Sequence, residues 1–177
     1  SDLDNTLSVS TFTVAGDPAV YAAGATATIV GNGTLTLGLN GDYTFTPDAD
    51  WNGTVPTVTY TTNTGSSSTL DITVTPLDDT PALSDDVATT PEDTPVIIDV
   101  LANDSDVDGD ILTITRIDDQ AVTVGVPVDV ANGTATLNAD GTITFTPDED
   151  YNGPVSFTYT ATDGTTPVTA DVNVTVT

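Results

Sequence analysis

The acidic segment Asp104–Asp110 is the part of the sequence whose residue types and spacing are best suited to chemistry. Its carboxylates stand at alternate positions, and a glycine at the sixth position allows a sharp turn. Calcium takes about six to eight oxygen ligands in loops of this kind, so the segment predicts a Ca²⁺ site built from Asp104, Asp106, Asp108 and Asp110. Thr115 stands where an EF-hand has its bidentate Glu, and a solvated acidic turn is the alternative.

The charge of the chain limits the partners that it can have. Asp and Glu number 27 against a single basic residue, Arg116, and the formal net charge is −26. Such a surface repels nucleic-acid phosphates and anionic lipids, so we expect no nucleic-acid binding and no direct membrane insertion. No stretch approaches the ~20 apolar residues that span a bilayer, and we expect any export signal to lie outside these residues.

The amino-acid types that the sequence lacks limit the reactions it could catalyse and the cross-links it could form. Without His, Cys and Lys, the Ser–His and Cys–His nucleophilic systems are excluded, and we expect no enzymatic activity. Disulfides and Lys–Asn isopeptide bonds cannot reinforce the fold either, which favours metal ions as the reinforcement of a small domain.

An internal repeat organises the chain. Gly41–Asp48 recurs as Gly141–Asp148, and Asp50–Gly53 recurs as Asp150–Gly153, at an offset of about 100 residues. Prolines and paired acids at 76–81 mark the boundary between the copies, because proline ends strand pairing. We therefore predict two domains, 1–79 and 80–177.

Within each copy the hydrophobic pattern has a period of two. Segments Thr142–Thr146 and Asp171–Val176 alternate polar and apolar residues, as do Ser8–Ser10 and Asp71–Thr75. Such alternation, with Asn-Gly and Asp-Gly turns between short strands, is typical of antiparallel β-sandwiches with one wet face, and it places Ile143 and Phe145 in the core.

The two copies differ at their starts. The second has residues ahead of its acidic loop, from Leu83 through a strand expected at Val96–Leu101, whereas the first begins at Ser1–Asp4, which matches Ser105–Asp108. The first domain is therefore predicted to be N-terminally truncated and to lack its first strands. Either the sequence was cut there or a neighbouring chain supplies the strands.

Four segments of the second copy occur in a characteristic order, namely Pro91–Val96, Val100–Asp110, Thr144–Gly153 and Tyr159–Gly164. In this order they resemble the cadherin-like, Ig-like tandem repeats of large bacterial surface adhesins, which often carry RTX repeats and use type I secretion. The resemblance implies an all-β chain of two tandem antiparallel β-sandwich domains. It also implies a secreted, cell-surface stalk that binds calcium and projects a distal adhesive domain in adhesion and biofilm formation, with an unknown distal ligand.

The resemblance also implies a ligand set and a partner. In cadherin-like modules calcium lies between consecutive domains, so the expected partners are neighbouring repeats of the same chain and calcium ions. Carried over by position, the ligands would be Asp48 and Asp50 of the first domain, Asp78 and Asp79 of the linker, and Asp104, Asp106, Asp108 and Asp163 of the second domain. Glu92, with Asp148 and Glu149, would face a further repeat.

A ligand-binding adhesive module, with sugar, peptide or ice as its target, is the alternative function. Trp51 and Tyr151 lie between an acid and Asn-Gly in the two copies, where an aromatic ring can stack on a sugar or close the end of a sandwich. Repetition favours the stalk, because stalks duplicate modules.

Overall fold

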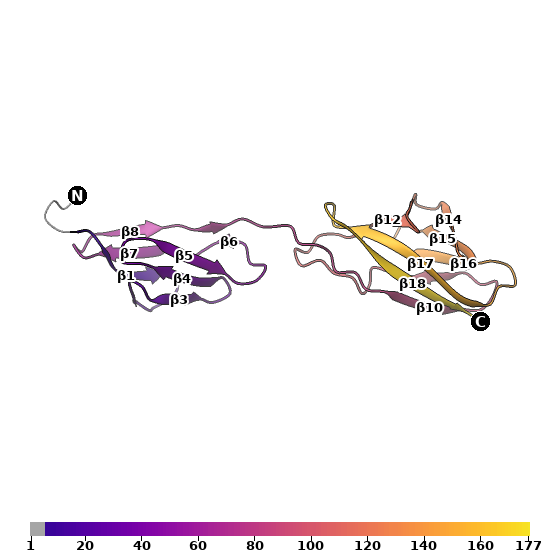
Figure 1. The fold of residues 1–177 in the computed structure, drawn as a ribbon, viewed down its shortest axis with the longest axis horizontal. Helices are drawn as coiled ribbons and strands as arrows, with labels where there is room; N and C mark the ends of the chain where they lie inside the picture. The colour runs from indigo at the N-terminus through magenta and orange to yellow at the C-terminus, as the bar shows by residue number, and fades with distance from the viewer. Residues whose placement is uncertain (1–5) are drawn as a thin grey trace. The chain divides into compact units, whose positions relative to one another are not determined.

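The computed structural model describes residues 6–177, which fall into two compact units. The first unit ends at Leu77 and the second begins at Asp78, whereas the predicted boundary follows Asp79. Every regular element of the described range is a β-strand, which confirms the predicted all-β class (Figure 1). No helix in that range is long and apolar enough to cross a membrane.

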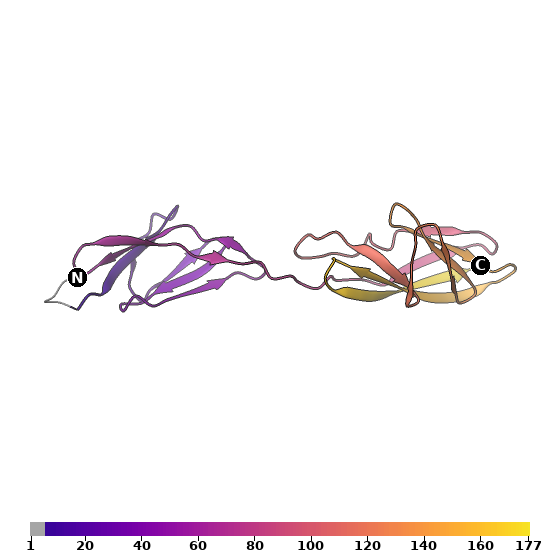
Figure 2. The ribbon, with the colours of Figure 1, turned by 90° about the horizontal axis from the view of Figure 1, so that it is seen from above.

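The second unit is a sandwich of two sheets (Figure 2). One sheet contains, in order, β10 (Asp86–Thr90), β18 (Pro167–Val176), β17 (Gly153–Thr162), β12 (Thr113–Ile117) and β13 (Gln120–Ala121). The other contains β11 (Val96–Ile98), β16 (Ile143–Pro147), β15 (Gly133–Leu137) and β14 (Pro127–Val130). All neighbouring strands are antiparallel except β10 and β18, which run parallel. Strand β11 ends at Ile98, short of the predicted Leu101, because the chain turns at 100–103 toward the acidic loop.

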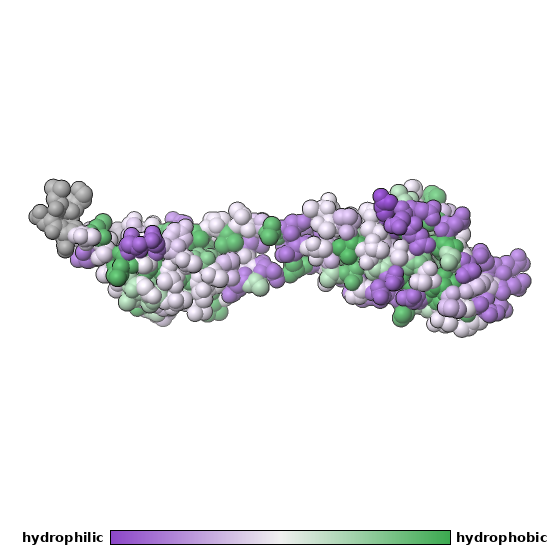
Figure 3. Space-filling view, viewed as in Figure 1, coloured by the Kyte–Doolittle hydropathy of each residue, from purple (hydrophilic) through white to green (hydrophobic). Residues whose placement is uncertain are grey.

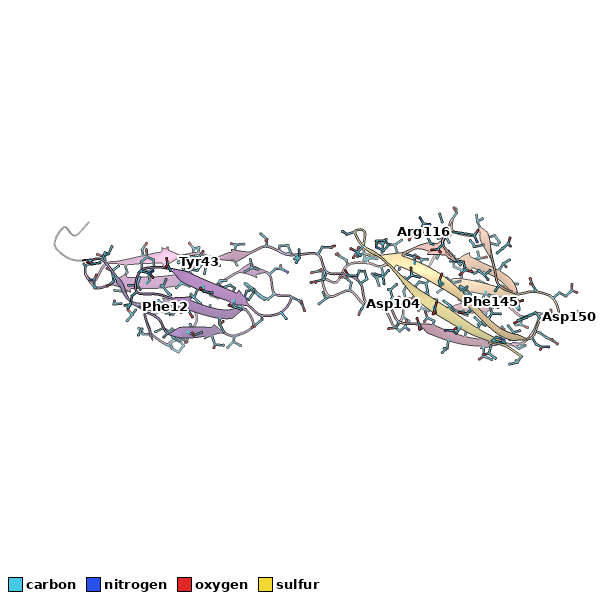
Figure 4. The ribbon with its side chains drawn as sticks, in the orientation of Figure 1. Phe12, Tyr43, Asp104, Arg116, Phe145 and Asp150 are labelled. Atoms are coloured by element: carbon cyan, nitrogen blue, oxygen red, sulfur yellow. The ribbon has the colours of Figure 1, made fainter. Side chains whose placement is uncertain are left out.

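The core of the second unit lies between its sheets and follows the predicted alternation. Ile143 and Phe145 are fully buried on β16, and Val172 and Val174 are buried on β18. Phe145, which is labelled in Figure 4, stacks on Phe157 with ring centroids 5.9 Å apart. Fully burying such a side chain contributes about 1.5–3 kcal/mol, so these inward positions supply most of the favourable free energy of folding.

The first unit has the same architecture with smaller sheets. One contains, in order, β2 (Tyr21–Ala22), β1 (Val9–Val14), β7 (Val58–Thr62) and β8 (Ser67–Leu70). The other contains β3 (Thr26–Ile29), β4 (Gly33–Leu37) and β5 (Tyr43–Pro47), and a short separate pair joins β6 (Gly53–Thr54) to β9 (Thr73–Val74). Of the alternating segment Asp71–Thr75, only Thr73–Val74 forms a strand, β9, because the chain leaves the sheet after β8 ends at Leu70.

The internal repeat extends to strand register. Leu35 is paired with Phe45 as Ala135 is with Phe145. Gly33 and Gly133 both approach a carbonyl oxygen so closely that a Cβ atom would lie 2.2 and 2.4 Å from it. As predicted, the described part of the first unit contains no strand that corresponds to β10 or β11.

The paired aromatic residues close the ends of the sandwiches. Trp51 meets Phe45 edge to face, with ring centroids 5.9 Å apart. The hydroxyl of Tyr151 donates a 2.8 Å hydrogen bond to the carbonyl of Pro154. Both rings are half-buried, and these contacts favour the closing role over sugar stacking.

Candidate metal centre

Asp106 organises the acidic loop that follows β11. Its Oδ1 atom accepts backbone N–H hydrogen bonds from Asp108 and Asp110, at 2.9 and 3.2 Å. Gly109 permits the turn with a φ of 80°, in the left-handed region. The second oxygen, Asp106 Oδ2, is buried and has no hydrogen-bond partner among the described residues. A buried carboxylate oxygen in this state is destabilising until a cation or a donor reaches it.

Asp163 repeats this arrangement in the loop between β17 and β18. Its Oδ1 atom accepts N–H hydrogen bonds from Thr166 at 2.7 Å and from Thr165 at 2.6 Å. These two backbone donors, Thr166 first, hold the pKa of Asp163 below its usual value. Asp163 Oδ2 is likewise buried without a partner in the described range. Two loops far apart in sequence therefore each fix one carboxylate oxygen and leave the other unpaired.

These loops place several carboxylates close enough together to repel one another. Burial raises the pKa of Asp110, and the negative charges of its neighbours raise it further, in the order Asp106, Asp108, Asp78 and Asp163. Asp79 adjoins the same group, because its N–H donates a 2.8 Å hydrogen bond to Asp108 Oδ2. We call this group the acidic pole and define it as Asp78, Asp79, Asp106, Asp108, Asp110 and Asp163.

The acidic pole has the donor chemistry of a calcium site but not yet its geometry. The one basic side chain, Arg116, donates its 2.7 Å hydrogen bond to the backbone carbonyl of Asp119. As the side chains stand, no three acids within residues 6–177 are arranged to hold a metal ion. Carboxylate oxygens are the ligands that calcium prefers, so the pole fits the ion in chemistry and would have to close around it.

Asp104, the first residue of the predicted calcium loop, is bonded on both oxygens by the protein. The hydroxyl of Tyr159 donates to its Oδ2 at 2.7 Å, and the N–H of Ser84 donates to its Oδ1 at 2.9 Å. Burial raises the pKa of Tyr159 well above its usual value, and the bond to Asp104 adds to that rise. Asp104 therefore ties the loop to the core.

The remaining predicted ligands lie elsewhere. Glu92 is on the turn between β10 and β11, where Asp93 Oδ1 accepts a 3.0 Å hydrogen bond from the N–H of Asp150. Figure 4 shows Asp104 and Asp150 at opposite ends of the second unit, and Figure 3 shows hydrophilic side chains gathered at the Asp150 end. Asp48 and Asp50 are exposed on the turn after β5 in the first unit.

Sequence reasoning missed one buried acid beside this site. Asp86, the first residue of β10, is only 7% exposed, and its Oδ2 has no hydrogen-bond partner in the described part of the chain. Burial first, and then the negative charge of Asp104, raises its pKa to about 6. Tyr159 was the residue in the sequence that could have indicated a buried polar group. It occupies an inward position of an alternating strand, where its hydroxyl must find a buried hydrogen-bond partner.

The second unit matches the family model of the bacterial Ig domain over residues 78–177, more than half of the chain. The chain belongs to the bacterial Ig domain family. Residues 2–76 match the model of a cadherin-like domain. The bacterial Ig and cadherin-like matches support the predicted repeats, and domains of these kinds are typically non-catalytic modules of extracellular or surface proteins. No curated protein matches the chain.

Several solved structures resemble the chain at low identity. Extracellular domains 3–5 of Drosophila OTK are 12% identical with a TM-score of 0.42, covering 97% of this chain and 52% of that one. BT4661, a SusE-like surface located polysaccharide binding protein from Bacteroides thetaiotaomicron, is 14% identical with a TM-score of 0.36. The match covers 98% of this chain and 36% of that one. The endo-fucoidan hydrolase MfFcnA4 is 18% identical with a TM-score of 0.36, covering 95% of this chain and only 24% of its own. Similarities at this level have no bearing on function.

Proposed function

We propose that this bacterial Ig chain is a calcium-binding stalk segment of a secreted bacterial surface adhesin, which holds a distal adhesive domain away from the cell. The acidic pole is the observation that carries the proposal. There the linker residues Asp78 and Asp79 adjoin two loops in which Asp106 and Asp163 each keep a buried, unbonded oxygen.

The residues of the pole would divide the work of binding calcium. The free Oδ2 atoms of Asp106 and Asp163 are already held in place by the bonds that their Oδ1 atoms accept. Asp78, Asp108 and Asp110 would supply further carboxylate oxygens toward the six to eight or so that calcium takes. Asp104 would act as a support, since the core already bonds both of its oxygens.

Binding would stiffen the joint at which the chain enters the second unit. Neutralising the pole removes the repulsion that raises the pKa of Asp110, and shared ligands tie residues 78 and 79 to the loops. Extracellular calcium modules bind with Kd of about 10⁻⁴–10⁻³ M, so an external medium would saturate them and the cytosol would not. This difference suits an adhesin that is exported by type I secretion, folds outside the cell and serves in biofilm formation.

Calorimetric unfolding in 10 mM calcium and in excess chelator tests the proposal. At about 10–100 times Kd, binding to the folded state adds about 1.4–2.7 kcal/mol. For a unit of this size, that raises the melting temperature by about 5 °C or more. Magnesium at the same concentration controls for charge screening, and small-angle scattering should show a narrower range of interdomain distances with calcium. Equal melting in calcium, magnesium and chelator would refute the proposal.

A matched pair of variants assigns the effect to the pole. Asp110→Asn removes one repelling charge, so it should raise the melting temperature in chelator and reduce the calcium-dependent rise. Asp129→Asn removes an equal charge from an exposed position of β14 and should leave the calcium response intact. An unchanged calcium response in Asp110→Asn would place the ion elsewhere.

A further inference from the structure

Strand β3 forms a free edge of its sheet in the first unit. Among the described strands it is hydrogen-bonded to β4 alone, and it lies at the margin of the unit in Figure 1. The second unit has the same edge, because β14 likewise ends its sheet beside β15. This edge therefore belongs to the fold that both units share.

The two edges differ in the residues that would block an added strand. By register, Thr26 stands where β14 has Pro127, and Thr28 stands where β14 has Asp129. All four residues are exposed. Natural edge strands use proline and charge to prevent pairing with another chain, so β14 is protected and β3 is not.

Pro127 also indicates which way the backbone faces at this position. A proline has no N–H, and within a sheet it is confined to places where that N–H would point away from the neighbouring strand. Thr26 lies opposite Thr36 in the same register as Pro127 lies opposite Thr136. The N–H of Thr26 is therefore directed outward from β3, where it can donate to an added strand.

Strand β3 also lies in a stretch of the chain without charge. Residues 18–41 contain none of the 27 acids, although the formal net charge of the chain is −26. The flanking acids, Asp17 and Asp42, lie in loops outside the strands. Val30, which directly follows β3, is apolar and 92% exposed. We call the free side of β3, with residues 26–30, the neutral edge.

We propose that the neutral edge binds the neutral edge of a second copy of this chain, with the two β3 strands antiparallel across a two-fold axis. The outward backbone groups of Thr26 and Thr28 in each copy exchange hydrogen bonds with those of the other copy. The threonine hydroxyls bond across the new boundary, as those of Thr26 and Thr36 do within one copy at 3.0 Å. The added strand also covers Val30.

Charge favours a second copy over other partners. A basic partner would be drawn to the acidic pole and to the rest of the acidic second unit. Copies of a chain with a net charge of −26 repel one another, but the neutral edge lets two copies meet without placing acids face to face. The edge therefore fits a partner whose matching strand is equally uncharged, and β3 of a second copy has that property.

Sedimentation equilibrium of the full chain in excess chelator tests this proposal independently of calcium. We expect a concentration-dependent dimer that is stronger in about 1 M NaCl than in about 0.01 M NaCl. The Debye length falls from about 30 Å to about 3 Å between these conditions, so the repulsion between copies is screened. Amide hydrogen exchange should show new protection on β3 in the dimer and none on β14.

Variants of the edge test the pairing itself. Thr26→Pro together with Thr28→Asp gives β3 the residues that β14 already carries in the same register, so the fold accepts them. Each copy loses one outward donor, and dimerisation should weaken about tenfold or more. Thr28→Asp alone keeps every backbone donor and should also weaken the dimer, because it places a charge at the edge of each copy.

Thr46→Asp is the matched control. Thr46 lies in the same row of the sheet as Thr28 but two strands away on β5, so the variant adds an equal charge away from the edge and should dimerise like the parent chain. A chain that stays monomeric at every concentration in high salt would overturn the proposal. A dimer that the edge variants leave unchanged, or that is strongest in low salt, would also overturn it.

Discussion

Tyr159 and Asp104 form a 2.7 Å hydrogen bond that joins the core of the second unit to its acidic loop. The tyrosine is fully buried on β17, and it also donates toward the carbonyl of Val100 at 3.0 Å. One end of the acidic loop is thus fixed from inside the sandwich. The acidic pole stands on this fixed base, whether or not calcium occupies it.

Tyr159→Phe should destabilise the second unit by about 1.5–3 kcal/mol, the value of a hydrogen bond to a charged group, because Asp104 Oδ2 loses its donor. Urea unfolding in excess chelator measures this loss without a contribution from calcium. Tyr151→Phe removes a hydroxyl bonded to a carbonyl at the surface, and about 1 kcal/mol or less is expected there. Equal losses in the two variants would contradict a special role for Asp104.

A second prediction concerns the unequal completion of the two cores. Phe145→Ala should cost about 3–5 kcal/mol, since the ring is fully buried and its removal leaves a cavity. Phe45→Ala should cost less than half as much, because the half-buried ring loses less apolar contact and water can fill the space. Calorimetry resolves the two units, since each variant lowers only its own transition. A loss at Phe45 as large as that at Phe145 would mean that the first core is closed.

The sequence predicted what depends on local pattern. A period of two places Ile143 and Phe145 inside without any knowledge of their partners. The offset between the copies predicts which strands correspond. It did not predict that Asp104 turns inward, because that depends on Tyr159, 55 residues away along the chain. The end of β11 at Ile98 was missed for a similar reason, since an apolar run does not show where the chain turns.

The third prediction concerns Asp86, whose buried position depends on the pairing of two strands that are far apart in the sequence. The parallel pairing of β10 with β18 sets Asp86 beside Val172, in the buried layer. Burial and the charge of Asp104 raise the pKa of Asp86 from 3.8 to about 6, and Asp85, Asn103 and Tyr159 also face it. The folded state therefore holds this proton more tightly than the unfolded state does. Protonation of Asp86 therefore stabilises the folded state. This contribution to the free energy of unfolding is complete below about pH 3.8 and is lost as the pH rises through about 6.

Asp86→Asn replaces the protonated acid by a neutral group of the same shape and should remove this pH dependence. Each pKa unit corresponds to about 1.4 kcal/mol, and relaxation around the charge reduces the total, so about 1–2 kcal/mol is expected. The free energy of unfolding of the parent chain minus that of the variant should fall by this amount between pH 4 and pH 8, measured in urea with chelator present. Asp129→Asn controls for the general titration of an acidic surface and should give a flat difference. A flat difference for Asp86→Asn as well would show that its carboxylate is solvated as an ordinary surface acid.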